Sequence, residues 1–174
     1  KNSSAFSLME LLTVIILLSI LLSAASFGFL IVLKTWGSQD KAAEIREDVR
    51  QGVEKMLRDL RLAKDIRVAD DSIRYTVRES GVDNNYIFYL YHPSDPWDTT
   101  YTQTVYQLKK AALSGDIGGT FVDGAGTIYV KEVKPPPTSD LSLSGHVITI
   151  DLTVAKYDET FHLRERIRPR NLYL

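Results

Sequence analysis

The most constraining feature of this sequence is a long uncharged stretch near its start. From Leu11 to Leu33, 23 consecutive residues include no Asp, Glu, Lys or Arg. As an α-helix this stretch is about 35 Å long, slightly more than the roughly 30 Å hydrocarbon core of a bilayer. A cleavable secretory signal has a shorter apolar region, and a helix in a soluble protein is rarely apolar on every face for so long. The stretch therefore predicts a retained membrane-spanning helix.

Charged residues are unevenly distributed along the 174-residue chain. Only Lys1 and Glu10 precede Lys34, so the two parts of the chain are suited to different solvents.

The overall composition excludes some classes of function. The net charge of −1 gives no general reason to expect a polyanion-binding protein. The lack of cysteine excludes disulfides, thiolate metal sites and cysteine nucleophiles. The length favours one domain with an appendage.

After Lys34 the apolar residues narrow to one stripe with the spacing of a helix. The stripe consists of Ile45, Val49, Val53, Met56, Leu57 and Leu60. The opposite, polar face contains Glu44, Glu47, Asp48, Arg50, Glu54, Lys55, Arg58 and Asp59. No proline occurs before Pro93, so we expect one helix to continue to Lys64. Gly28, Gly37 and Gly52 mark places where this helix could bend or melt.

Beyond Asp65 the apolar period changes to two, which is typical of β-strands. We expect strands at Ile73–Val77, Tyr86–Tyr91, Val105–Lys109, Ile128–Val133, Ile148–Val154 and Phe161–Ile167. Lys134–Asp140 contains three prolines and is expected to be a loop. These features predict an α+β fold, in which a long N-terminal helix packs its second half on an antiparallel β-sheet head.

Glu10 stands immediately before the apolar stretch. A carboxylate in hydrocarbon costs at least ~2.5 kcal/mol, so an acid at membrane depth usually marks a site with a specific partner. The alternative is that Glu10 lies near the headgroups and its side chain reaches the interface.

The residues around Glu10 resemble the N-terminal signature of the type IV pilin superfamily. The matching residues are Phe6, Ser7, Leu8, Met9, Glu10 and Leu11, followed by the apolar run. The resemblance implies that prepilin peptidase cleaves between Ala5 and Phe6, that the new α-amine of Phe6 is methylated, and that Glu10 pairs with this amine on an adjacent subunit during assembly. Ala5 stands where the family usually has Gly, and the chain starts at Lys1 without an initiator Met or the usual basic leader.

The resemblance also implies a division of the chain. Residues 1–5 would be the end of the prepilin leader, 6–33 the transmembrane and assembly helix, 34–64 the amphipathic stalk helix, and 65–174 the antiparallel β head. The later segments look like minor subunits of the J-type pseudopilin and W-type minor pilin kind. The expected function is a non-enzymatic structural subunit of a type II secretion pseudopilus, at or near its tip, in the bacterial inner membrane with its head in the periplasm or extracellular space. Its partners would be other pilin-like subunits and prepilin peptidase.

Two other functions remain open at this point. One is a minor subunit of a type IV pilus that acts in pilus initiation, adhesion or DNA uptake. The other is a single-pass membrane sensor, which needs neither processing nor Glu10.

Other residues give weaker signals for chemistry. His92, His146 and His162 lack metal-ligand spacing and are interpreted as surface positions. Asp116 and Asp123 lie in a glycine-rich loop, and a calcium site that uses them or Asp95 and Asp98 is a weaker alternative to turn-forming aspartates. We expect no cofactor.

A basic row lies on the last predicted strand and just beyond it. It consists of Arg164, Arg166, Arg168 and Arg170. Such a row can contact phosphates. The sequence favours instead an edge strand kept soluble by its charge, or one that pairs with acidic neighbouring subunits, over a nucleic-acid site.

Overall fold

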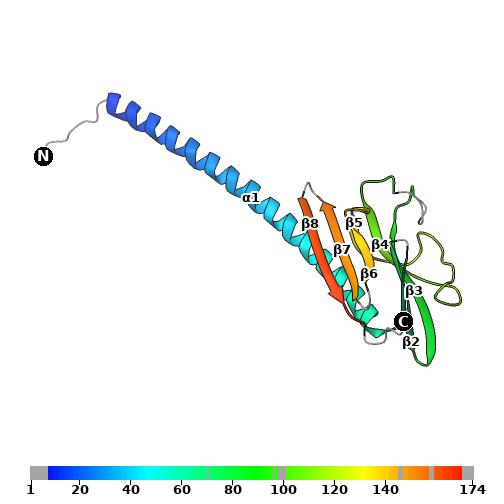
Figure 1. The fold of residues 1–174 in the computed structure, drawn as a ribbon. Helices are drawn as coiled ribbons and strands as arrows, with labels where there is room; N and C mark the ends of the chain where they lie inside the picture. Colours follow the sequence, from blue (N-terminus) through cyan, green and yellow to red (C-terminus); the bar gives the residue numbers. More distant parts are fainter. Residues whose placement is uncertain are drawn as a thin grey trace. The chain divides into compact units, whose positions relative to one another are not determined.

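The computed structural model describes residues 8–69, 71–95, 97, 101–144, 147–156 and 159–169. The chain divides into two compact units, the first ending at Lys41 and the second beginning at Ala42. One helix, α1 (Leu8–Leu62), contributes residues to both units. Figure 1 follows the chain by colour from this helix, in blue and cyan, to the last strand, in red.

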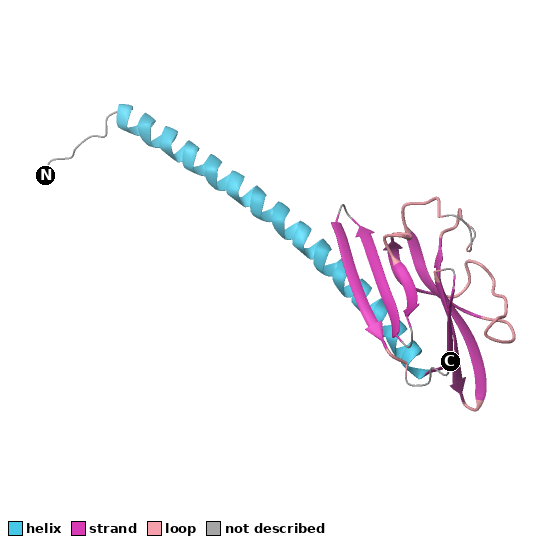
Figure 2. Ribbon diagram, viewed as in Figure 1, coloured by secondary structure: helices cyan, strands magenta, loops and turns pink. Residues whose placement is uncertain are grey.

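The second unit combines the end of α1 with strands that form one sheet (Figure 2). The strands are β1 (Ala63–Ala69), β2 (Ser72–Glu79), β3 (Val82–Tyr91), β4 (Tyr106–Ala112), β5 (Thr127–Val133), β6 (Asp140–Ser144), β7 (Val147–Lys156) and β8 (Glu159–Ile167). All the pairings between them are antiparallel. The expected α+β fold and the six strands read from the sequence are thus confirmed.

The sheet consists of two meanders that meet at one point. Strands β1 to β5 pair in chain order, and β7 pairs with β6 and β8. β5 reaches β7 only at Val133, which pairs with Val154. The sheet also curls, so that β1 comes close to β6. β5 stays paired with β4, and where it has separated from β7 it approaches α1 at Tyr129 and Val130.

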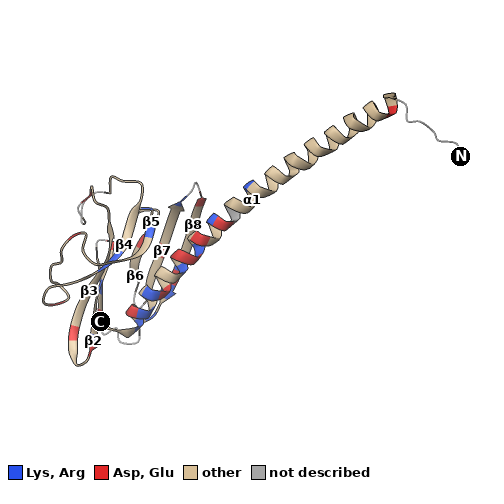
Figure 3. Cartoon of the chain, turned by 180° about the vertical axis from the view of Figure 1, so that it is seen from behind, with Lys and Arg blue, Asp and Glu red and all other residues tan. Residues whose placement is uncertain are grey.

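The amphipathic stripe of α1 forms the centre of the core. All six of its members are buried, with at most 9% of their surface exposed, against apolar residues of the sheet. Figure 3, in which charged residues are coloured, shows that charges are concentrated in the C-terminal part of α1. The helical period of the sequence therefore identified the buried face of this helix correctly.

Gly52 has a different role from the expected weak point in the helix. A Cβ added there would lie 2.2 Å from the carbonyl oxygen of Tyr129 and 2.7 Å from a methyl group of Val130. Glycine thus permits the backbone of α1 to touch β5, where β5 has left β7.

The helix ends earlier than the sequence suggested. α1 stops at Leu62, and Ala63 already begins β1, a strand that the sequence analysis did not identify. β1 pairs with β2 at once, through Ala63 and Val77. β2 and β3 are joined at Ser80 and Gly81, both with positive φ, which suits a tight two-residue hairpin turn.

A second, smaller apolar cluster lies apart from the main core. It contains Ile87, Tyr89, Ala111 and Leu113, with Tyr91, Trp97 and Phe121 packed against it. The glycine-rich segment after β4 is tied to this region by Arg74, whose guanidinium donates to the carbonyl of Gly119 at 2.8 Å, and by the hydroxyl of Tyr89, which donates to the carbonyl of Ala125 at 3.0 Å.

Candidate functional site

The N-terminal part of α1 is apolar and exposed. Its large apolar side chains from Leu8 to Leu33 have 43–79% of their surface exposed. Among the described residues, α1 is the one helix long and apolar enough to cross a membrane, with a mean hydropathy of 2.6 in its most apolar window. This part of the helix has the composition of a single-pass membrane segment.

The hydroxyl groups in this segment are satisfied within the helix. Thr13, Ser19, Ser23 and Ser26 each donate to the carbonyl oxygen four residues earlier, at 2.6–2.8 Å. A hydroxyl bonded in this way presents no free donor to its surroundings. These four hydroxyl residues are therefore compatible with lipid.

Glu10 lies in the first turn of α1 with its side chain exposed. A carboxylate there interacts favourably with the positive end of the helix dipole. Ala5 and Phe6, the expected cleavage and methylation positions, lie outside the described residues.

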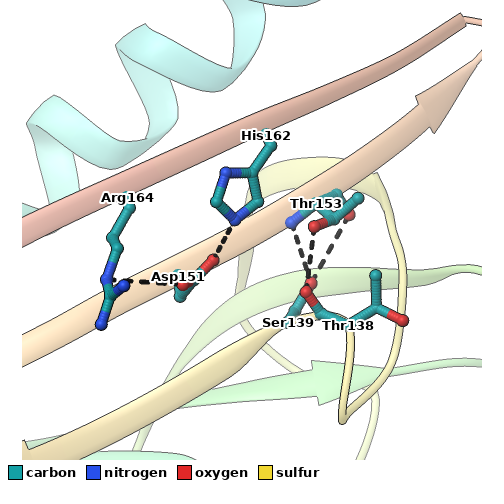
Figure 4. Close-up of polar contacts among 6 residues, drawn as sticks. All are labelled: Thr138, Ser139, Asp151, Thr153, His162 and Arg164. Atoms are coloured by element: carbon teal, nitrogen blue, oxygen red, sulfur yellow. Dashed lines mark hydrogen bonds and ion pairs between the residues drawn. The ribbon is translucent and has the colours of Figure 1, made fainter.

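A polar cluster lies across β7 and β8. Asp151 on β7 stands opposite Arg164 on β8 and contacts two side chains of that strand. One carboxylate oxygen is 2.5 Å from Nε2 of His162, and the other is 3.6 Å from Nε of Arg164. Figure 4 shows Asp151 between these two residues. His162 is exposed, as the sequence suggested, and its ring is in addition held by a carboxylate.

Beside this cluster, Thr153 fastens the loop before β6 to β7. Its backbone N–H donates to Oγ of Ser139 at 2.9 Å, and its hydroxyl donates to the carbonyl of Thr138 at 2.9 Å (Figure 4). Ser139 is buried, with 2% of its surface exposed. Its hydroxyl thus has a structural hydrogen bond, and the loop after Pro137 is fixed on the sheet.

The basic row is partly confirmed in its geometry. Arg164 and Arg166 lie on β8 with exposed side chains, and Arg168 is exposed just beyond the strand. Arg164 shares Asp151, whereas Arg166 and Arg168 make no ion pair within the described part of the chain. Arg170 lies outside it.

Asp59 forms a polar cluster that the sequence analysis missed. The sequence pattern predicts Asp59 on the polar face of α1, but its side chain is only 23% exposed. Its Oδ2 atom accepts from Lys110 at 2.7 Å, from Tyr129 at 2.8 Å and from Tyr75 at 3.2 Å. Burial and the nearby carboxylate raise the pKa of Tyr75 and that of Tyr129 above the usual value. The only warning in the sequence is that Asp59 directly precedes Leu60 at the edge of the apolar stripe.

Asp95 holds together the segment between β3 and β4. It accepts hydrogen bonds from the hydroxyl of Thr102 at 2.6 Å, from the Thr102 backbone N–H at 2.9 Å, and from the hydroxyl of Tyr106. These bonds lower the pKa of Asp95 to about 2. His92 accepts from the backbone N–H of Ser94 at 3.1 Å. Both residues thus organise a turn.

Asp116 and Asp123 also make turn hydrogen bonds. Asp116 accepts from the backbone N–H of Gly118 at 2.9 Å, and Asp123 from those of Gly124 at 2.9 Å and Trp97 at 3.3 Å. Within the described ranges, no three His, Asp or Glu side chains gather as a metal-binding group. Asp98 and His146 lie outside these ranges. The turn interpretation accounts for the contacts of Asp116 and Asp123.

Comparisons with protein-family models, curated proteins and solved structures found no match to this chain. What the chain does must therefore be inferred from its own residues.

Proposed function

We propose that this chain is a pilin-like structural subunit that assembles through its N-terminal helix into the pseudopilus of a type II secretion system, at or near the tip. In this proposal it supports protein export without being an enzyme. It is held in the bacterial inner membrane by residues 6–33, with its head on the periplasmic side. Prepilin peptidase cleaves it between Ala5 and Phe6 and methylates Phe6.

The observation that carries the proposal is the contrast within α1. The helix begins with an exposed apolar segment in which Glu10 is the one described charge before Lys34, and it ends as the central element of a folded head. An exposed apolar helix alone would serve any membrane anchor. A carboxylate at its start is costly in lipid unless a cation meets it, which favours a helix that joins other helices.

The proposed cation is the α-amine of Phe6 on a neighbouring subunit. This amine appears only after cleavage, so unprocessed chains lack the charge that neutralises Glu10. Only one axial stagger of two such helices brings both charges together, and the pair therefore sets the register of assembly.

A second candidate is a minor subunit of a type IV pilus in initiation, adhesion or DNA uptake. The exposed side chains of Arg164 and Arg166 favour it, because phosphate contacts use such arginines. DNA affinity that falls steeply with salt would support this candidate over the secretion subunit.

Glu10→Gln tests the proposal in cells that contain prepilin peptidase and the secretion machinery. A neutral amide costs less to bury than a carboxylate, so membrane insertion should be unchanged or improved. Crosslinking to sister subunits should fall at least about tenfold, which corresponds to about 1.4 kcal/mol. Asp40→Asn removes an exposed acid from the same helix and should change neither quantity.

Mass spectrometry of the membrane-purified protein supplies the second measurement. The first residue should be Phe6 with a methylated amine. A chain that still begins before Ser4, or wild-type crosslinking and secretion with Glu10→Gln, would contradict the proposal and leave a plain anchor or membrane sensor.

A further inference from the structure

β8 is an open edge of the sheet. It pairs with β7 along its whole length, from Glu159 to Ile167, and with no other described strand. β1 is also an edge strand, but the curl of the sheet brings it close to β6. The edge of β8 that faces away from β7 therefore has backbone N–H and C=O groups without a strand partner among the described residues. Such an edge is a template for another extended chain.

The inner side of this edge borders an apolar groove. Phe161 and Leu163 of β8 are only half-buried, and with Val53 and Leu57 of α1 they line a groove of about 400 Å³. At its rim Arg50 is paired with Glu54 at 2.9 Å, and Arg46 and Glu165 complete the lining. The groove is thus apolar in its floor and nearly neutral at its rim, and it suits apolar side chains.

The outer side of the same edge is basic. His162, Arg164 and Arg166 occupy alternate positions of β8 and are exposed. Alternate residues of a strand are about 6.7 Å apart, which is also the spacing of alternate residues in a strand added beside it. Asp151 offsets part of this charge near Arg164, whereas Arg166 has no acidic partner in the described ranges. Acidic side chains on an added strand would therefore match this row.

A second copy of β8 does not fit this edge. Its own arginine row would lie beside the first, and like charges on neighbouring strands are destabilising.

We propose that β8 accepts an added β-strand from a partner protein, an extended segment in which acidic and apolar residues alternate. Its acidic side chains lie over Arg164 and Arg166, and its apolar ones enter the groove beside Phe161 and Leu163. The proposal is independent of the proposed function, since it uses neither Glu10 nor processing at Phe6.

The probe is a synthetic nine-residue peptide, the length of β8, in which glutamate and valine alternate. The full chain, in detergent micelles, is titrated with this peptide and with one that alternates lysine and valine. We expect saturable binding of the acidic peptide, with slower hydrogen exchange at the amides of β8, and at least tenfold weaker binding of the basic one. No binding of the acidic peptide at millimolar concentration and low salt overturns the proposal.

Backbone methylation separates strand addition from simple charge attraction. In an added strand only every second N–H faces β8. N-methylation of one alternate set of peptide residues should abolish binding, while methylation of the other set should leave it within about twofold. Equal tolerance of both sets overturns the proposal, because ion pairs alone would then account for binding.

Charge reversal on the protein supplies the matched comparison. Arg164→Glu with Arg166→Glu should weaken binding of the acidic peptide about tenfold, since two exposed ion pairs with its glutamates are replaced by like-charge contacts. Arg67→Glu changes an exposed arginine on the other edge strand, β1, and should have no effect. Equal losses in both variants overturn the proposal. Binding of a single-stranded DNA oligomer at Arg164 and Arg166, without binding of the peptide, also overturns the proposal.

Because Glu10→Gln should leave peptide binding unchanged, failure of the assembly proposal and failure of this one give different results.

Discussion

The two parts of α1 differ in the way they present apolar side chains. Between Leu8 and Leu33 these side chains surround the helix, and they are 43–79% exposed. From Ile45 to Leu60 they are confined to one stripe, and they are at most 9% exposed. The helix is continuous by its hydrogen bonds, so its backbone does not explain the difference.

The contrast shows that the number of apolar residues in a helix and their arrangement around it give different information. A stripe with a period of 3.6 predicts one protein surface that will cover it. Apolarity on every face predicts a surrounding that is itself apolar on every side, such as lipid. The same helix type thus serves two solvents, and substitutions at matched positions can test the distinction.

The largest expected effect is from a charge in the stripe. Met56 is fully buried, so Met56→Asp should lower the free energy of unfolding of the head by about 4 kcal/mol. Lys55→Asp, at the exposed neighbouring position, should change it by less than about 0.5 kcal/mol. Leu22→Asp in the apolar part should also leave it unchanged. The stabilities of the three variants can be measured by chemical denaturation of the full chain in detergent. The fluorescence of Trp97 reports unfolding when all proteins also contain Trp36→Phe. Equal stability of Met56→Asp and Lys55→Asp would contradict the burial of the stripe.

The glycines of α1 give the second comparison. Gly52→Ala places a methyl group against the Tyr129 carbonyl, so we expect a loss of about 3 kcal/mol as α1 is pushed from β5. At Gly28 nothing lies within 4 Å of the added methyl group. Gly28→Ala should therefore leave the head as stable as the wild type and favour the helix locally by about 1 kcal/mol. The same denaturation assay applies, and a stabilising Gly52→Ala would show that the close approach is absent.

The third comparison concerns two acids on the head portion of α1. Asp59→Asn removes the charge that Lys110 meets at 2.7 Å, and we expect a loss of about 2 kcal/mol. The pKa of Tyr129 should also fall toward its usual value, because the carboxylate that helps to raise it is gone. Asp48→Asn, at an exposed position, should change neither quantity appreciably. Denaturation and ultraviolet titration of tyrosine are the measurements. If Asp59→Asn leaves the stability unchanged, Asp59 does not make the contact with Lys110 and lies on the solvent face of α1.

The smallest effect should appear only in acid. The pKa of Asp95 is lowered from its ordinary value of 3.8 to about 2, so the folded state holds this proton less tightly than the unfolded state. Its contribution to stability is therefore full above about pH 4 and is lost as the pH falls toward about 2. Asp95→Asn should be less stable than the wild type at neutral pH and show a flatter acid dependence. Parallel pH curves for both proteins would mean that Asp95 does not have these partners.

Much of the fold could be predicted from periodicity. The stripe from Ile45 to Leu60 and the alternation in β2, β7 and β8 are local patterns, and each identifies its element without knowledge of its neighbours. β1 was missed because its apolar residues, Ile66 and Val68, directly follow a strong helix, and only pairing with β2 makes it a strand. The short β6 was missed because it follows the three prolines and depends on β7 for its pairing.

Some candidate functional residues could likewise be identified from the sequence, and others could not. Glu10 and the apolar segment could be identified from sequence, because the cost of a charge in hydrocarbon depends on residue type and position along one helix. The exposed arginines of β8 followed from strand alternation. Their relation to Asp151, and the partnership of Asp59 with Lys110, could not be predicted, since these residues are 13 and 51 positions apart.

By itself the sequence determined that this chain has one helix with two kinds of surface followed by an antiparallel sheet, because hydrophobic period and charge are properties of neighbouring residues. Only the tertiary structure decided that Gly52 contacts β5, that Asp59 is a half-buried partner of Lys110, and that β8 is the open edge beside an apolar groove. The reason is that each of these depends on which backbone atoms and charges from distant segments come within a few ångströms, and local patterns do not encode that proximity.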